Sequence, residues 1–119
     1  MRLFLLGTVA LIATASAALA GDDLMANTYG NTLVSISSGG MESHTYYNVD
    51  HTFSGKVPAL GFEYKGTWMI DDKGQLCRNF DPPVPGRTNP DCGAMVSHAV
   101  GDKWTSEEGS TITLSQGVN

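Results

Sequence analysis

The fold of this chain is decided by the stretch FEYKGTWMI (Phe62–Ile70), which is followed by the turn DDKG (Asp71–Gly74). Apolar and aromatic side chains alternate with polar ones along the stretch, as on a strand with one buried face. Gly66 lies on the apolar face between two aromatic rings, where it allows a bend or leaves room for the rings. The turn then predicts a hairpin that returns through Gln75–Phe80.

Outside this hairpin, short runs of β-branched and aromatic residues are separated by glycine-rich turns, which is typical of β structure. We expect one helical turn at Asp22–Ala26 and a loop with four prolines at Asp81–Gly93. About eight short strands in up-and-down order must curl or close to hide their edges. The sequence therefore predicts an all-β fold, a small antiparallel up-and-down barrel or half-barrel. The further strands are predicted at Thr32–Ser37, His44–Val49, His51–Val57, Met95–Val100, Lys103–Ser106 and Thr111–Leu114.

Residues 1–20 have the order of properties of a signal peptide. Arg2 supplies the positive start, an apolar stretch covers Leu3–Ile12, and the small-x-small pattern Ala18-Leu19-Ala20 precedes the predicted cleavage site. The alternative is a retained N-terminal anchor, but the apolar stretch is short for a stable membrane span. We therefore expect a periplasmic or secreted protein without a stable membrane anchor, with residues 21–119 as its single domain.

The net charge and the two cysteines limit the classes of function that the sequence allows. The formal net charge is −5, which makes nucleic acid an unfavourable partner because phosphate backbones repel an acidic surface. The two cysteines, Cys77 and Cys92, are predicted to form a disulfide in an oxidising compartment. Two buried free thiols are the alternative. A metal site is not expected, because zinc would need His44, His51 and His98 from separate strands, and no cofactor is expected.

Strand alternation directs three polar side chains toward apolar faces. Arg78 lies between Leu76 and Phe80, and His98 and His51 lie on apolar faces of their predicted strands. An interior guanidinium suits the carboxylate or phosphate of a ligand. The alternative is an arginine that extends to solvent from an edge strand or pairs with an acidic neighbour, Glu63 or Asp81.

Candidate acid and base groups are His98, His51 and Tyr46. A histidine on an apolar face is, alternatively, a core residue with its hydrogen bonds satisfied. Tyr46 and Tyr47 face opposite sides of their strand, so one of them should point inward. No G-x-S-x-G motif, P-loop or G-x-G-x-x-G motif is present in the sequence.

Several short motifs occur in a recognisable order. They are Gly30-Asn31-Thr32, then Asp50–Gly55, then Gly66–Ile70, then Gly74–Cys77 with the second cysteine at position 92. This series resembles small exported proteobacterial domains of unknown function with G-N-T, D-G-T-x-x-G, G-T-W and G-x-L-C motifs. Here His51 stands where those domains have a turn glycine. The resemblance implies a lipocalin-like small barrel outside the cytoplasm and carries over no catalytic residue.

Three functions remain in view. The first is a small-ligand-binding or accessory protein, in which Tyr64, Trp68 and Phe53 contact a small amphipathic or acidic ligand and Arg78 and His98 fix its polar end. The second is a cofactor-free isomerase, lyase or hydrolase that uses the histidine and tyrosine candidates. The third is an inhibitor or envelope interaction module that presents the proline-rich loop between Cys77 and Cys92.

Overall fold

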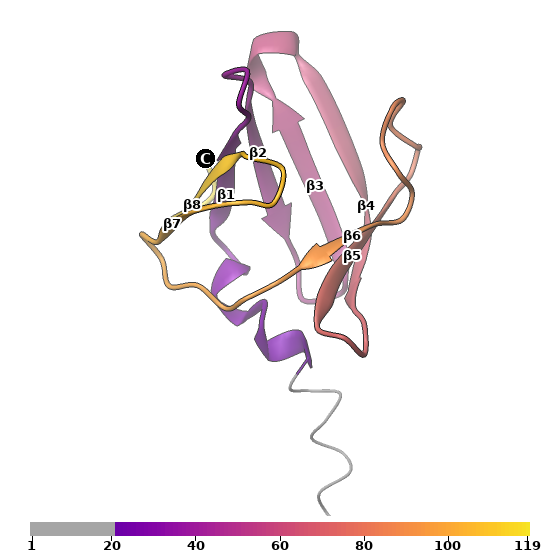
Figure 1. Ribbon diagram of the computed structural model, residues 1–119, viewed down its shortest axis with the longest axis vertical. Helices are drawn as coiled ribbons and strands as arrows, with labels where there is room; N and C mark the ends of the chain where they lie inside the picture. Colours follow the sequence, from indigo (N-terminus) through magenta and orange to yellow (C-terminus); the bar gives the residue numbers. More distant parts are fainter. Residues whose placement is uncertain (1–20) are drawn as a thin grey trace, which may run out of the picture.

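The computed structural model describes residues 21–119, and the predicted signal peptide lies outside them. Eight antiparallel strands form one sheet that curls into a half-barrel, with a short helix and the 3₁₀ turn η2 (Ala26–Thr28) at the N-terminal side (Figure 1). The predicted fold class is confirmed. The strands are β1 (Thr32–Ile36), β2 (Glu42–Tyr47), β3 (Thr52–Val57), β4 (Phe62–Ile70), β5 (Gln75–Phe80), β6 (Asp91–Ala94), β7 (Lys103–Thr105) and β8 (Thr111–Ser115).

The order of strands in the sheet is β6-β5-β4-β3-β2-β1-β8-β7, so β8 pairs with the first strand. This pairing is the one that closes an up-and-down barrel. The remaining gap lies between β6 and β7, which are the two edge strands and are joined by residues 95–102. We call this gap the seam. The half-barrel is therefore a barrel that opens along a single line.

The central hairpin forms as the sequence predicts, with β4 and β5 at the expected residues. Its turn is held by Asp71, whose Oδ1 accepts hydrogen bonds of 2.9 Å from the backbone N–H groups of Lys73 and Gln75. Gly74 has a φ of 77°, a left-handed conformation that favours glycine. The residue types of the turn thus fix the register, which places Trp68 opposite Arg78.

The structure corrects one predicted strand. Residues 95–100 form no strand, whereas β6 begins at Asp91, inside the segment 81–93 predicted as a loop. The disulfide fits this placement, because Cys92 is the register partner of Cys77 on β5 and the two residues are therefore close enough to be bonded. In the following segment, local partners replace a strand ladder, since the backbone N–H of Ala99 donates to the Asp102 carboxylate at 2.9 Å.

The aromatic core occupies the end of the half-barrel next to residues 21–28, which we call the packed end. Alternation along the strands directs its side chains inward, and Met25 of the N-terminal segment covers them from below. The buried members of this core are Met25, Tyr47, Phe53, Trp68 and Phe80.

No helix within residues 21–119 combines the length and apolar character needed to cross a bilayer.

Two inward glycines shape the sheet. A Cβ on Gly66 would collide with the backbone carbonyl of Asn79 on β5, so only glycine allows this close approach of the strands. A Cβ on Gly55 would collide with the ring of Tyr64, which lies across β3. At Gly66 the space is therefore taken by the backbone of β5, whereas it is Gly55 that leaves room for an aromatic ring.

Candidate functional site

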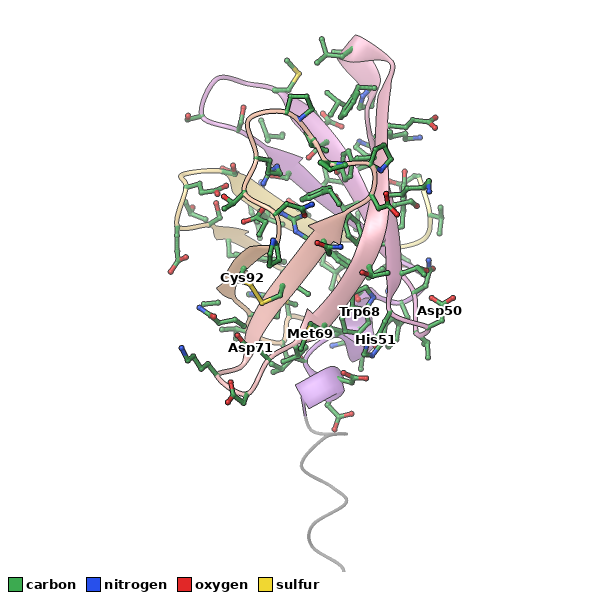
Figure 2. The ribbon with its side chains drawn as sticks, turned by 90° about the vertical axis from the view of Figure 1, so that its right-hand side faces the viewer. Asp50, His51, Trp68, Met69, Asp71 and Cys92 are labelled. Carbon is green, nitrogen blue, oxygen red and sulfur yellow. A yellow bond between two sulfur atoms is a disulfide. The ribbon has the colours of Figure 1, made fainter. Side chains whose placement is uncertain are left out.

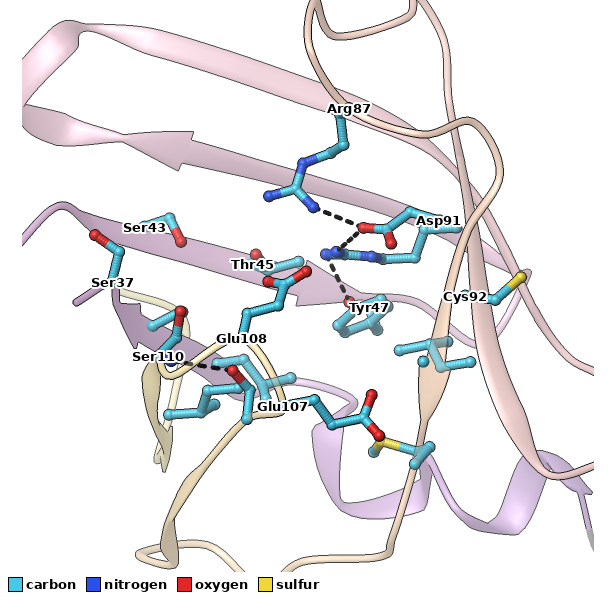
Figure 3. Close-up of a pocket in the computed structure, with 18 of the residues that line it drawn as sticks. Ser37, Ser43, Thr45, Tyr47, Arg87, Asp91, Cys92, Glu107, Glu108 and Ser110 are labelled. Atoms are coloured by element: carbon cyan, nitrogen blue, oxygen red, sulfur yellow. Dashed lines mark hydrogen bonds and ion pairs between the residues drawn. The ribbon is translucent and has the colours of Figure 1, made fainter. Parts of the chain in front are cut away.

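The concave face of the half-barrel holds a cavity of about 690 Å³ (Figure 3). Tyr47 and Phe80 of the packed end form its floor. The opposite part, which we call the hollow end, has small hydroxyl side chains on β1, β2 and the β7–β8 turn, beside Val57, Phe62 and Tyr64 of β3 and β4. These hydroxyls belong to Ser35, Ser37, Ser43, Thr45, Ser106 and Ser110. Apolar lining comes from Leu33, Leu76, Val84, Met95, Trp104 and Ile112.

A cluster of two arginines and one aspartate forms the wall near the floor. Arg78 Nη2 donates to Asp91 Oδ2 at 2.9 Å, and Arg87 Nη1 donates to the same oxygen at 2.6 Å. Both guanidinium groups lie over the ring of Phe80, with their central carbons 5.3 and 5.6 Å from the ring centre. Because two positive groups share one carboxylate, the cluster keeps an excess positive charge that faces the cavity.

The hydroxyl of Tyr47 completes this wall. Arg78 Nη1 donates to the Tyr47 oxygen at 3.5 Å, a long hydrogen bond. Burial raises the pKa of the Tyr47 phenol, an effect that the neighbouring Arg78 only partly offsets. The phenol is therefore neutral at ordinary pH and keeps a proton to donate, for which residues 21–119 supply no acceptor.

The guanidinium of Arg78 stays protonated and positively charged. Burial lowers the pKa of its guanidinium, but the adjacent Tyr47 and Asp91 raise it by more, so the pKa lies above its usual value. The side chain remains partly accessible from the cavity, with 23% of its surface exposed. The partly buried guanidinium of Arg78 and the neutral phenol of Tyr47 each offer a hydrogen-bond donor to a molecule in the cavity.

At the hollow end, some hydroxyl groups have a hydrogen-bond partner within residues 21–119 and others have none. The hydroxyls of Thr45 and Tyr64 bond each other at 2.6 Å, which fixes the tyrosine ring over β3. Ser35 and Ser43 are register partners on β1 and β2, and their hydroxyls have no hydrogen bond to any other residue in the described range 21–119. Glu107 and Glu108, on the β7–β8 turn, also line the cavity, and Glu108 lies beside Arg87 and Asp91.

Three of the five predicted ligand-contacting residues line the cavity: Arg78, His98 and Tyr64. The other two, Phe53 and Trp68, are each 2% exposed and belong to the core beneath the floor. Their rings support Tyr47 from below, with centroids 5.9 and 6.3 Å from the Tyr47 ring. They therefore shape the floor of the cavity without lining it.

His98 reaches the cavity from a loop, not from the predicted strand. Its ring is stacked on Trp104 of β7 at a centroid distance of 3.4 Å and an interplanar angle of 3°. Its Nδ1 lies 3.6 Å from Asp102 Oδ2, and its backbone oxygen accepts a hydrogen bond of 2.8 Å from Asn27. The histidine thus forms part of the wall at the seam.

His51 and Tyr46 are not among the residues that line the cavity. His51 lies at the packed end, where its ring is stacked on Trp68 at 4.2 Å and its Nε2 is 2.9 Å from Asp22 Oδ2 (Figure 2). Tyr46 points away from the barrel interior and donates to the backbone oxygen of Asn119 at 2.7 Å. The structure therefore does not bring the three predicted acid and base candidates together.

The loop between the cysteines folds back on the barrel. The side chain of Asn89 accepts a hydrogen bond from the backbone N–H of Phe80 at 2.7 Å and donates to its carbonyl at 3.1 Å. Val84 and Arg87 of the same loop line the cavity. The disulfide is present as predicted, between adjacent residues of β5 and β6.

Sequence reasoning missed Asp91, Arg87 and Tyr47. Asp91 had a usable signal, because an antiparallel hairpin that pairs Cys77 with Cys92 also pairs Arg78 with Asp91. The expected partners of Arg78 were Glu63 and Asp81, and neither bonds it. Tyr47 was the inward member of a tyrosine pair whose orientation the sequence left open.

Comparison of the chain with protein-family models, with curated proteins and with solved structures finds no match. Within residues 21–119, no three side chains of histidine, cysteine, aspartate or glutamate gather as metal ligands would. The side chains that line the cavity offer hydrogen-bond donors, hydroxyls, carboxylates and an apolar wall.

Proposed function

We propose that this protein is a small-ligand-binding protein of the periplasm or the extracellular space, with a lipocalin-like barrel. Its ligand is a small amphipathic acid held in the cavity. One observation carries the proposal: small inward side chains on β1 and β2 leave a cavity at the hollow end, although the packed end of the same sheet is filled. A volume of about 690 Å³ is within the range of small-molecule sites.

The polarity of the cavity supports an acid as the ligand. Arg78 and Tyr47 offer donors at the floor, and Arg87 adds a second positive group beside them. The wall between the floor and the mouth is apolar and suits a hydrocarbon body. The acidic end of the ligand would lie against Arg78, with His98 at the seam on the opposite side.

The compartment is inferred from two features that agree. The disulfide between Cys77 and Cys92 suits an oxidising environment, and residues 1–20 have the pattern of a signal peptide. The resemblance to small exported domains points to the same location. Mass spectrometry of small molecules that co-purify with the protein from its native compartment would identify the ligand directly.

A titration with decanoate tests the proposal in a defined system. Trp104 lines the cavity, whereas Trp68 is buried in the core, so a change in fluorescence should persist in Trp68→Phe and disappear in Trp104→Phe. Replacement Arg78→Gln should weaken decanoate binding at least tenfold, because a hydrogen bond to a charged group contributes about 1.5–3 kcal/mol.

The matched control is Lys65→Gln, which removes a positive charge from the exposed outer face of β4. Its affinity for decanoate should equal that of the unmodified protein. The proposal is wrong if decanoate does not bind, or if Arg78→Gln and Lys65→Gln bind it equally well.

A further inference from the structure

The two ends of the cavity differ in the hydrogen bonds that they offer. At the floor, Tyr47 and Arg78 offer hydrogen-bond donors beside the Asp91 carboxylate that Arg78 and Arg87 share. These donors suit a group that only accepts, such as a carboxylate. At the hollow end, Ser35 and Ser43 present hydroxyls that can donate and accept equally well.

The Tyr47 hydroxyl is the sharpest of these signals. The residue is 5% exposed, lines the cavity and keeps a proton without an acceptor in residues 21–119. Because the hydroxyl lines the cavity, an oxygen from solvent or from a ligand can accept its hydrogen bond. A ligand oxygen at this position would replace solvent as the acceptor.

The arginine cluster gives the ligand an orientation. Arg78 and Arg87 share the single carboxylate of Asp91, which leaves positive charge for an acidic group of a ligand at the floor. Glu108 of the β7–β8 turn lies beside Arg87 and Asp91 at the edge of this cluster. A ligand with one acidic group would place it at Arg78, so that its other end lies among the hydroxyls of the hollow end.

The spacing along β2 gives the length of the ligand. Ser43, Thr45 and Tyr47 lie on the same face of the strand, and Tyr47 is four positions after Ser43. At 3.3 Å per residue, the Cα atoms of Ser43 and Tyr47 are about 13 Å apart. Thr45 between them is already bonded to Tyr64, so the unpaired hydroxyls are those of Ser43 and its partner Ser35.

We propose that the ligand is a medium-chain carboxylic acid that carries a hydroxyl group at its far end. Its carboxylate lies at Tyr47 and Arg78, its chain lies along the apolar wall, and its hydroxyl bonds Ser35 and Ser43. This inference rests on the proposed binding function and adds the chemical class of the ligand. An unsubstituted chain would place its methyl end against polar groups and gain no hydrogen bond there.

The test compares decanoate with its ω-hydroxy derivative on the purified protein by isothermal titration calorimetry. The unmodified protein should bind the hydroxylated acid about fivefold to tenfold more tightly, as expected for one or two hydrogen bonds. The double variant Ser35→Ala/Ser43→Ala should bind both acids with equal affinity. The matched control Ser54→Ala, on the exposed outer face of β3, should keep the preference.

The outcomes separate this inference from the function beneath it. Equal binding of the two acids to the unmodified protein, or a preference that survives in the double variant, overturns the hydroxyl assignment and leaves the binding function standing. Failure of both acids to bind overturns the proposed function itself. Loss of all binding in the double variant, with circular dichroism unchanged, contradicts a role limited to the hydroxyl end.

Discussion

The packed end and the hollow end are built by the same strands. On β2 the inward residues change from Tyr47 to Thr45 to Ser43 as the strand leaves the core, and on β1 they change from Leu33 to Ser35. The backbone geometry is the same at both ends, because alternation sends every second side chain inward. On these two strands the inward side chains become small toward the hollow end and leave space there, whereas β3 and β4 keep Val57, Tyr64 and Phe62 at the same end.

The largest expected difference between the ends is in stability. Phe53→Ala should lower the free energy of unfolding by about 3–5 kcal/mol, because it empties a buried position of the aromatic core. Phe62→Ala, at the mouth of the cavity, should cost less than about 1 kcal/mol, since this ring is already 40% exposed. Urea denaturation of both variants measures the difference, and similar costs would refute the division into two ends.

The disulfide tests how the seam is held. Replacing Cys77 and Cys92 by serine should cost about 3 kcal/mol, as expected for a closed loop of roughly 15 residues in the chain-entropy argument. Hydrogen exchange should show that the edge strand β6 loses protection, while the central strands β2 and β3 keep theirs. Uniform loss of protection across the sheet would mean that the seam does not open independently of the central strands.

His51 tests the outer side of the packed end. Its φ of 72° is a left-handed conformation, which costs a residue with a Cβ about 1–2 kcal/mol. His51→Ala keeps this strain and loses the contacts with Trp68 and Asp22, whereas His51→Gly loses the contacts and relieves the strain. The glycine variant should therefore be the more stable of the two by about 1 kcal/mol in thermal unfolding. A more stable alanine variant would contradict this account.

The smallest effect on stability is expected from filling the hollow end. Ser43→Leu should change the free energy of unfolding by no more than about 1 kcal/mol, because the cavity has space for the side chain. The same change should weaken decanoate binding at least tenfold. Ser54→Leu, on the exposed outer face of β3, is the matched control and should leave binding unaltered. A large loss of stability in Ser43→Leu would show that the hollow end is not open.

Most of the fold follows from local pattern. The β4–β5 hairpin forms at its predicted residues because alternation and the Asp71 turn act within a few residues of each other. The predicted strand over residues 95–100 is wrong, although its apolar residues suit a strand. The edge strand β6 instead precedes this segment, where Cys92 lies opposite Cys77 of β5.

The site was predictable in part. Alternation placed Arg78 and Tyr64 on the inner face, and both line the cavity. It also placed Phe53 and Trp68 there, but alternation does not tell how deep a side chain lies, and these two are in the core. Tyr46 lies on the outer face and Tyr47 on the inner face. This depends on the register in which β2 pairs with β3.

The sequence by itself determined the class of fold, the central hairpin, the disulfide and the inward direction of Arg78, because each depends on residue type and on short spacing. Only the tertiary structure decided that the barrel opens at a seam between β6 and β7, and that Tyr47, Arg78, Arg87 and Asp91 meet on one wall. These features depend on how the sheet curls and which strands remain edges. Curling is a property of the whole sheet, and no single stretch of sequence specifies it.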